Sequence, residues 1–187
     1  MPCLSEADGK AILELARQAV AEAVCQERLP EGIPQSGVFE QRCGVFVTLH
    51  MGRRLRGCIG VIEAKEPLGV SLVRCAASAA LMDPRFERVR PEEMKELEIE
   101  VSLLSALQPI RPAEIEIGKH GLLVEQGWHR GLLLPQVALE HHLNKEQFLK
   151  ETCHKAGLPG DAWSAADTRI YAFTCEIVSE GERQAVR

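Results

Sequence analysis

Hydrophobic residues near the start of the chain recur every three or four positions, which is the spacing of one face of a helix. The run begins after Ser5 and continues to Leu29, directly before Pro30. A serine at this place is a common helix N-cap, because its hydroxyl accepts a hydrogen bond from a backbone N–H of the first turn. We therefore expect an N-terminal helix over residues 5–29, capped by Ser5.

The pattern then changes to short apolar runs separated by glycine and proline, which is typical of strands joined by turns. Helical spacing returns from Leu68 and stops near Asp83-Pro84, because the residue before a proline disfavours helical geometry. The elements expected in this block are a strand at 44–50, a turn at 51–54, a strand at 55–62, a helix at 68–81, a short helix from Pro91 and a strand at 97–105.

The same order of elements returns in the second half of the chain. The expected elements are a strand at 121–125, a turn at 126–130, a strand at 131–134, helices at 136–143 and 145–156, and a strand at 168–179. The first block, 44–105, is 62 residues long and the second, 121–180, is 60. Two tandem ββα(α)β units of this kind predict an α+β fold in which antiparallel sheets carry outer helices.

Composition restricts the class of protein. The chain of 187 residues is 45% hydrophobic, and its longest apolar-looking segment, 69–82, is interrupted by Arg74. A membrane span needs about 20 apolar residues, and the N-terminus lacks the cationic and apolar regions of a secretion signal. With 27 acidic against 22 basic residues and 4% aromatic residues, a dedicated nucleic-acid-binding protein is not expected either. These features favour a cytoplasmic globular protein.

Seven cysteines are irregularly spaced, and no two of them form a C-x-x-C pair. A disulfide scaffold is therefore not expected. The cysteines and histidines that are neighbours in sequence, Cys153-His154 and His141-His142, are adjacent positions of predicted helices, whose side chains diverge by about 100°. We expect no metal site from them, and the sequence identifies no cofactor.

The string LRGCIG, residues 55–60, combines a cation, a thiol and two glycines on one predicted strand. Alternate strand residues share a face, so Arg56 and Cys58 are expected to point the same way. A guanidinium beside a thiol favours the thiolate and makes the cysteine a nucleophile, and Gly57 and Gly60 indicate close approach by a ligand or by another backbone. The alternative is a packed cysteine, an arginine paired with a carboxylate and glycines required for packing, which is the more frequent situation.

Three other places carry polar groups that could line a site. Asp83 and Arg85 follow a predicted helix and either face a ligand or pair with each other across the turn. His120, on the turn before the second hairpin, is either an acid or base in a cleft or an exposed turn residue. Gln136 stands where a strand passes into a helix, and it either presents its amide to a ligand or is an ordinary residue of the first helical turn.

LRGCIG stands in register with GKHG at 118–121 and GLLLPQ at 131–136, and through these strings the chain resembles the AMMECR domain family. Further matching segments lie at 44–49, 76–80, 83–86, 97–105 and 137–138, and around Trp163 and Tyr171. The resemblance covers nearly the whole chain and implies one AMMECR domain over residues 1–187. It also implies an α+β fold of two lobes with a cleft near LRGCIG.

Stand-alone bacterial and archaeal members of this family are encoded with a Memo-like protein, related to metal-dependent extradiol dioxygenases, and with a radical SAM protein. The resemblance therefore implies those two partners. It also implies the role of an accessory protein or subunit, of unestablished biochemical activity, whose site is at LRGCIG.

Two other functions stay open. An autonomous enzyme would use Cys58 as nucleophile or transient carrier, with Arg56 stabilising the thiolate or an anionic substrate and His120 acting as acid or base. A nucleic-acid-binding module would use the basic cluster of Arg53, Arg54 and Arg56. The site is expected to be composite, formed where both halves of the chain bring these residues together: Arg56, Gly57, Cys58, Gly60, Asp83, Arg85, His120 and Gln136.

Overall fold

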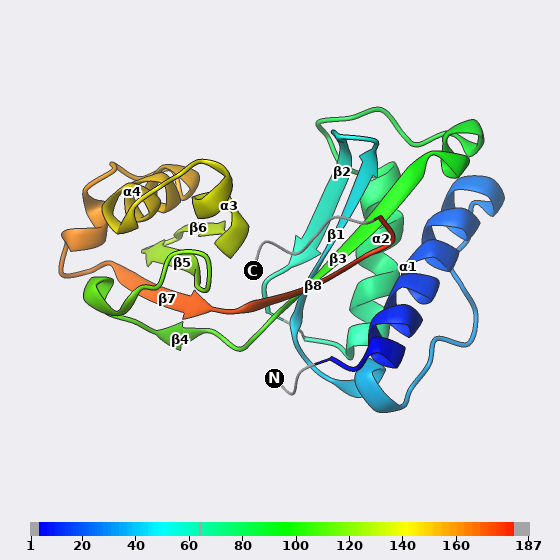
Figure 1. Ribbon diagram of the computed structural model, residues 1–187, viewed down its shortest axis with the longest axis horizontal. Helices are drawn as coiled ribbons and strands as arrows, with labels where there is room; N and C mark the ends of the chain where they lie inside the picture. The colour runs from blue at the N-terminus through cyan, green and yellow to red at the C-terminus, as the bar shows by residue number, and fades with distance from the viewer. Residues whose placement is uncertain (1–3, 64, 182–187) are drawn as a thin grey trace. The chain divides into compact units, whose positions relative to one another are not determined.

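The computed structural model describes residues 4–63 and 65–181 and divides into two compact units. The first unit contains residues 4–104 and the later segment 176–181, and the second contains residues 105–175. Each unit has a four-stranded sheet with helices packed against it (Figure 1). No described helix is both long enough and apolar enough to cross a membrane.

The sheet of the first unit has the strand order β2-β1-β3-β8, with β1 antiparallel to both β2 and β3. The two helices of this unit, α1 and α2, pack against each other and against the sheet. The elements are α1 (Glu6–Gln26), β1 (Gly44–Met51), β2 (Arg54–Val61), α2 (Leu68–Leu81), β3 (Leu97–Leu104), β8 (Cys175–Ser179) and the 3₁₀ helices Gly37–Glu40 and Pro91–Lys95.

The sheet of the second unit has the order β4-β7-β5-β6, with β5 antiparallel to both β6 and β7. The elements are β4 (Gln108–Pro109), β5 (Gly121–Gln126), β6 (His129–Leu133), α3 (Pro135–Glu140), α4 (Lys145–Lys155), β7 (Arg169–Phe173) and the 3₁₀ helices Pro112–Glu114 and Ala162–Ser164. The order β6-β5-β7 in this sheet is the same as β2-β1-β3 in the other.

The α+β prediction is confirmed, because the structure has two antiparallel sheets with helices packed on them. The prediction of a single strand over 168–179 is wrong. The chain forms β7, interrupts the ladder at Thr174 and continues as β8, which belongs to the other sheet. In the same way, β3 is followed by β4, which pairs with β7. A period-two pattern shows which side chains are half-buried but contains no information about which sheet each part of a run joins.

The predicted cap of the first helix is confirmed. The Ser5 hydroxyl accepts from the Asp8 backbone N–H at 3.1 Å, and the Asp8 carboxylate accepts from the Ser5 backbone N–H at 3.3 Å. The helix ends at Gln26, three residues before the expected Leu29, because Glu27 adopts a left-handed conformation with φ 54°.

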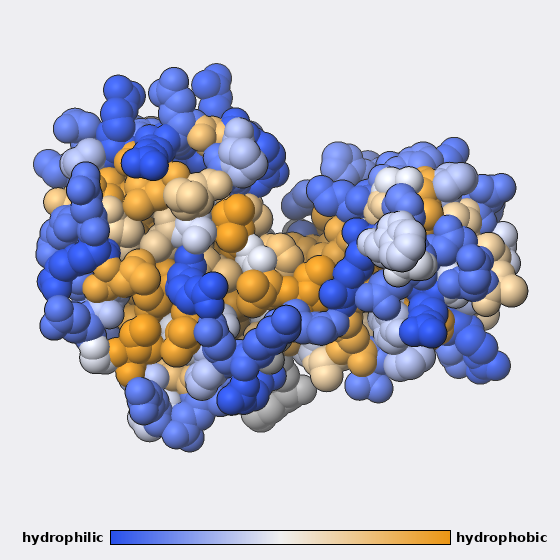
Figure 2. Space-filling view, turned by 180° about the vertical axis from the view of Figure 1, so that it is seen from behind, coloured by the Kyte–Doolittle hydropathy of each residue, from blue (hydrophilic) through white to orange (hydrophobic). Residues whose placement is uncertain are grey.

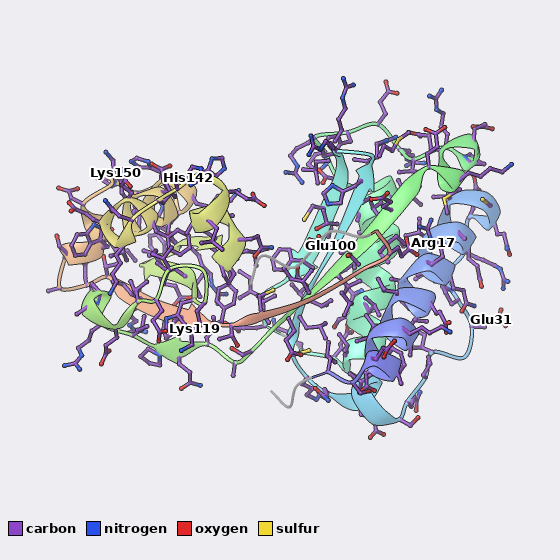
Figure 3. All side chains as sticks on the ribbon, in the orientation of Figure 1. Arg17, Glu31, Glu100, Lys119, His142 and Lys150 are labelled. Atoms are coloured by element: carbon purple, nitrogen blue, oxygen red, sulfur yellow. The ribbon has the colours of Figure 1, made fainter. Side chains whose placement is uncertain are left out.

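Arg17, labelled in Figure 3, ties the middle of α1 to one end of the sheet. Its guanidinium donates to the backbone carbonyls of Met94 (3.3 Å) and Leu97 (2.6 Å) and forms a bidentate ion pair with Glu180. Glu180 also accepts from the Ile99 backbone N–H at 2.9 Å. The segment after β8 is therefore held against both α1 and β3.

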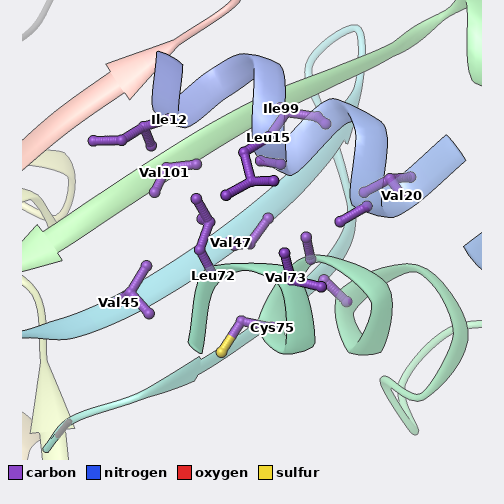
Figure 4. Packing of buried hydrophobic residues seen from close by; sticks show 14 of the residues in the cluster. Ile12, Leu15, Val20, Val45, Val47, Leu72, Val73, Cys75, Ile99 and Val101 are labelled. Carbon is purple, nitrogen blue, oxygen red and sulfur yellow. The ribbon is translucent and has the colours of Figure 1, made fainter. Parts of the chain in front are cut away.

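The core of the first unit lies between its sheet and its two helices (Figure 4). Ile12 and Val20 of α1, Leu72 of α2, and Val47 and Ile99 of the sheet are almost fully buried. Each such side chain contributes about 1.5–3 kcal/mol relative to full exposure. The second unit has cores of its own, which include Leu122, Phe148 and Leu149. Val89 of the segment after α2 belongs to the core of the first unit and Ile59 of β2 packs against it, so this core holds both in fixed positions.

Candidate functional site around Cys58

LRGCIG lies on β2, which is an edge strand of its sheet. Cys58 lies directly opposite Thr48, and Gly57 lies opposite Leu49, but the next residue of β1, His50, lies opposite Leu55. Arg56 is therefore the extra residue of a β-bulge, and a bulge interrupts the strict alternation of side chains. Simple alternation therefore does not establish that Arg56 and Cys58 share a face.

The guanidinium of Arg56 is bound by the segment that follows α2. It donates from Nε and Nη2 to the Glu93 carboxylate at 2.8 and 3.0 Å, and to the backbone carbonyls of Glu87 (2.6 Å) and Arg88 (3.1 Å). Its hydrogen bond lowers the pKa of Glu93, and Glu93 in turn raises the pKa of Arg56. This contact matches the alternative, left open by the sequence, in which the arginine of the motif is paired with a carboxylate.

Asp83 binds the outer edge of β2 at Cys58. Its Oδ2 accepts from the Cys58 backbone N–H at 2.8 Å, and its Oδ1 accepts from the Arg85 backbone N–H at 3.1 Å. The Arg85 guanidinium donates to both oxygens, at 3.0 and 2.7 Å, and to the Cys58 carbonyl at 3.3 Å. The Asp83 side chain is 2% exposed. Hydrogen bonds from Arg85 first, and then from the two backbone N–H groups, hold the pKa of Asp83 far below its usual range.

The cation beside Cys58 is therefore Arg85 and not Arg56. The Arg85 side chain is 55% exposed and lies over the Phe86 ring, with its central carbon 5.3 Å from the ring centroid. On the other side of the cysteine, the Thr48 hydroxyl lies 3.3 Å from the Cys58 sulfur and can donate to it. The sequence pattern indicates Arg85 as a candidate site residue but favours Arg56 as the cation beside the thiol. Arg85 lies beside Cys58 because a tertiary contact brings the turn after α2 to β2, and sequence spacing does not reveal that contact.

Gly57 and Gly60 are required by packing within the protein. A Cβ at Gly57 would lie 2.1 Å from the backbone oxygen of Ala79 in α2, and a Cβ at Gly60 would lie 2.3 Å from the ring of Phe46. Of the two explanations for glycine in a strand, close approach of another backbone accounts for Gly57. At Gly60 an aromatic side chain of the neighbouring strand fills the space.

The two remaining residues of the expected composite site, His120 and Gln136, belong to the second unit. His120 Nδ1 accepts from the Glu116 backbone N–H at 3.1 Å, so the neutral imidazole carries its proton on Nε2 and presents a donor there. Gln136 is in the first turn of α3, and its Oε1 is buried with no hydrogen-bond partner among the described residues. Convergence of these two residues with Cys58 stays a prediction.

Comparison with known proteins identifies the family. A family model described as AMMECR1 matches residues 13–178, which span both units. The chain belongs to the AMMECR1 family. A protein of Methanothermobacter thermautotrophicus is 45% identical over 95% of this chain and 96% of its own length. A protein of Thermococcus gammatolerans is also 45% identical, over 92% of this chain and 90% of its own length.

Among solved structures, the crystal structure of an uncharacterised protein from Pyrococcus horikoshii matches this AMMECR1-family chain with a TM-score of 0.83. The two sequences are 40% identical, and the match covers 90% of this chain and 89% of the other. The names of these relatives state no activity, so the family is known and the reaction or binding partner has to be argued from the residues.

The other cysteines of the AMMECR1-family chain are free thiols in the described residues. Cys43 and Cys75 are buried, and burial raises the pKa of each to about 11. Burial also raises the pKa of Cys153. These three thiols are protonated at neutral pH and poor nucleophiles. No group of three or more His, Cys, Asp or Glu side chains in residues 4–63 and 65–181 is arranged to hold a metal ion.

The lowered pKa of Asp83 predicts a loss of stability in acid. A carboxyl group with a lower pKa in the folded than in the unfolded chain contributes stability above the unfolded pKa of about 3.9, and this contribution is lost as the pH falls through the folded value. We expect the stability difference between the wild type and Asp83→Asn, measured by urea unfolding, to shrink progressively below about pH 4. Glu14→Gln, on the exposed face of α1, is the control and should show no such convergence. A constant difference from pH 7 to pH 2 would contradict the prediction.

Proposed function

We propose that this protein is an accessory protein or subunit that acts with a Memo-like protein and a radical SAM protein, and that it binds a partner through the region around LRGCIG. The proposal is supported by the hydrogen bonds that the charged residues at the motif make within the protein. Arg56 donates to Glu93 and to two backbone carbonyls, and both oxygens of Asp83 accept two hydrogen bonds each. These groups fix the backbone and are not available to a substrate.

What remains accessible around the motif suits binding by a partner. Leu55 and Val61, near the two ends of β2, are exposed, and Arg85 is half-exposed with its guanidinium stacked on Phe86. Arginine is one of the residue types enriched at binding hot spots, and the exposed Leu55 and Val61 add apolar surface that a partner can cover. Because the backbone is already held by Asp83 and Glu93, little ordering entropy is lost when a partner binds here.

Co-purification tests this proposal. The chain is co-expressed with the Memo-like and radical SAM proteins of the same genome, as wild type and as Cys58→Ala, Leu55→Asp and Trp128→Asp. We expect Cys58→Ala to retain the complex, and Leu55→Asp to reduce its recovery about tenfold or more, because a charge replaces an apolar contact. Trp128 is the most exposed large apolar residue described and lies in the second unit, so Trp128→Asp is the matched control. Failure of the wild type to co-purify with either partner would contradict the proposal.

A second function, an enzyme with Cys58 as nucleophile, is favoured by one observation. Arg85 and the Thr48 hydroxyl flank the cysteine: the Arg85 guanidinium donates to the Cys58 carbonyl at 3.3 Å, and the hydroxyl lies 3.3 Å from the Cys58 sulfur. A cation and a hydroxyl donor are groups that stabilise a thiolate. Under this alternative Arg85, and not Arg56, is the stabilising cation.

Alkylation of the cysteines, read by peptide mass spectrometry from pH 5 to 10, separates the two functions. We expect exposed Cys25 to react, and buried Cys43 and Cys75 to stay unreacted until the protein unfolds. If Cys58 is a nucleophile, it reacts faster than Cys25 at neutral pH, and Arg85→Ala slows its reaction while Arg56→Ala leaves it unchanged. Reaction of Cys58 at the rate of Cys25 in all variants would favour the binding function.

Nucleic-acid binding has less support. Arg53 and Arg54 are exposed at the hairpin turn, but the third arginine of the cluster, Arg56, is engaged by Glu93. Two exposed cations on a chain with a formal net charge of −5 make a weak electrostatic contact with phosphates.

A further inference from the structure

A groove lined by both apolar and charged residues lies where α1 and α2 end. Two adjoining hollows, of about 520 and 320 Å³, share Leu29, Ala77, Leu81 and Arg88 as lining residues. We call their combined surface the helix-end groove. Its other apolar lining residues include Val24 and Met82. All of these residues belong to the first unit.

The apolar surface of this groove is exposed to solvent. Met82 is 66% exposed and Leu29 is 46% exposed, and they belong to a group of six large hydrophobic residues exposed in the described chain. Figure 2 shows, for one face of the molecule, that hydrophobic side chains, in orange, lie exposed among hydrophilic ones, without identifying single residues. Contiguous apolar surface surrounded by polar residues is characteristic of sites that bind other proteins.

Three of the four charged residues that line the groove are basic, Arg28, Arg74 and Arg88, and the fourth is Glu27. Arg28 and Arg74 line it, and each has an acidic partner: Glu22 lies 3.2 Å from Arg28, and Glu66 lies 2.7 Å from Arg74. Arg88 lines both hollows, and no acidic side chain pairs with it among the described residues. Arg88 is therefore the cation that can accept a new carboxylate partner.

The backbone that carries Arg88 is held from two sides. Arg56 of LRGCIG donates to the Arg88 carbonyl at 3.1 Å, and the next residue, Val89, donates its backbone N–H to the Ala80 carbonyl at 2.8 Å. The Val89 side chain is buried and also lines the groove. The motif arginine thus contributes to the shape of this wall, and a rigid wall lowers the entropy cost of binding.

We propose that the helix-end groove binds an acidic amphipathic helix of a partner protein. The inference rests on the proposed function, since it presumes that the protein is a binding subunit. An amphipathic helix fits a groove between helices by inserting apolar residues spaced i, i+3, i+4 and i+7. Here those residues cover Leu29, Leu81 and Met82, and a carboxylate at the edge of the apolar stripe pairs with Arg88. An extended strand is disfavoured, because helix side chains line the groove and present no open strand edge for pairing.

The probe is a phage-displayed library of 18-residue peptides with leucine fixed at i, i+3, i+4 and i+7 and the other positions drawn from Ala, Gln, Glu and Lys. Selection is carried out on the wild type, Arg88→Glu, Met82→Asp and Lys10→Glu. Lys10 is an exposed cation near the other end of α1, with a 3.8 Å ion pair to Glu14, so Lys10→Glu makes the same charge change outside the groove. Circular dichroism establishes that each variant is folded before selection.

We expect glutamate-rich peptides to be enriched on the wild type and on Lys10→Glu, and lysine-rich peptides on Arg88→Glu. The most enriched peptide should bind Arg88→Glu and Met82→Asp about tenfold or more weakly than the wild type in fluorescence anisotropy. The proposal is overturned if no peptide is enriched on the wild type over Met82→Asp, if lysine-rich peptides are preferred by the wild type, or if Arg88→Glu selects the same sequences as Lys10→Glu.

These outcomes are independent of the co-purification experiment. Selection of acidic helices without recovery of the Memo-like and radical SAM proteins would leave the groove as a binding site and reject those two partners. Recovery of the partners with equal yield on wild type, Arg88→Glu and Met82→Asp, together with no enriched peptide, would keep the proposed function and reject the groove.

Discussion

Gly57→Ala should destabilise the first unit by about 3 kcal/mol, the upper end of the range for overpacking a well-packed site. The added Cβ would lie 2.1 Å from the Ala79 carbonyl oxygen of α2 and 3.1 Å from its carbonyl carbon. Both are backbone atoms, so relief requires movement of the helix away from β2. Since α2 contributes Leu72 and Ala76 to the core, that movement also loosens core packing.

Urea unfolding followed by hydrogen exchange of peptides from the first unit measures this effect. Both tryptophans, Trp128 and Trp163, lie in the second unit, so tryptophan fluorescence reports that unit separately. Gly9→Ala is the control: it is the same substitution near the start of α1, where the Cβ would lie 3.1 Å from a Val178 side-chain carbon, which can move, and alanine favours the helix. If Gly57→Ala is within about 0.5 kcal/mol of the wild type, close backbone packing does not explain this glycine and a ligand-facing role regains support.

Asp83→Ala should reduce the unfolding free energy of the first unit by about 2–3 kcal/mol. The substitution removes four hydrogen bonds at once and leaves the Cys58 and Arg85 backbone N–H groups without their acceptor. Loss of a partner from a buried polar group costs about 1–3 kcal/mol, and more where a charge is involved. Arg85→Ala should cost less, because its side chain is half-exposed and its charge is already solvated.

Hydrogen exchange at the Cys58 amide gives a local readout of the same contact. Asp83→Ala should speed its exchange, while Asp161→Ala, a change at an exposed aspartate of the second unit, should leave both this amide and the stability of the first unit unchanged. An Asp83→Ala protein with wild-type stability and wild-type exchange at Cys58 would show that Asp83 does not hold β2, and would return it to the set of groups available for ligand binding.

Local pattern was sufficient for most elements of this fold. The Ser5 cap, the helix at Leu68–Leu81 and the hairpin of β1 and β2 follow from capping chemistry, helical spacing and turn residues, all of which act over a few positions. The helix expected at 136–143 ends earlier, at Glu140, and His142 has a positive φ of 51° that no sequence periodicity indicates.

The site shows where local pattern is insufficient. LRGCIG was recognisable from its residue types, but the partners of its arginine are 31 to 37 positions away, at Glu87, Arg88 and Glu93. The bulge at Arg56 is a property of how β2 pairs with β1, so strict alternation could not identify the neighbours of its side chain. Likewise, Arg85 reaches Cys58 only because α2 and β2 pack together through Gly57.

By itself, the sequence determined the α+β class, the element order and the position of the unusual motif, because these depend on interactions between residues close in the chain. Tertiary structure decided which strands share a sheet: β7 and β8, separated at Thr174, belong to different sheets. It also decided which charged side chains form hydrogen bonds with the protein's own backbone. It also decided that Leu29, Met82 and Arg88 meet at one groove. The physical reason is that hydrogen bonds and packing contacts between distant segments form only when the whole core is packed. The chemistry of a charged or nucleophilic side chain depends on these contacts, so it cannot be deduced from its neighbours in sequence.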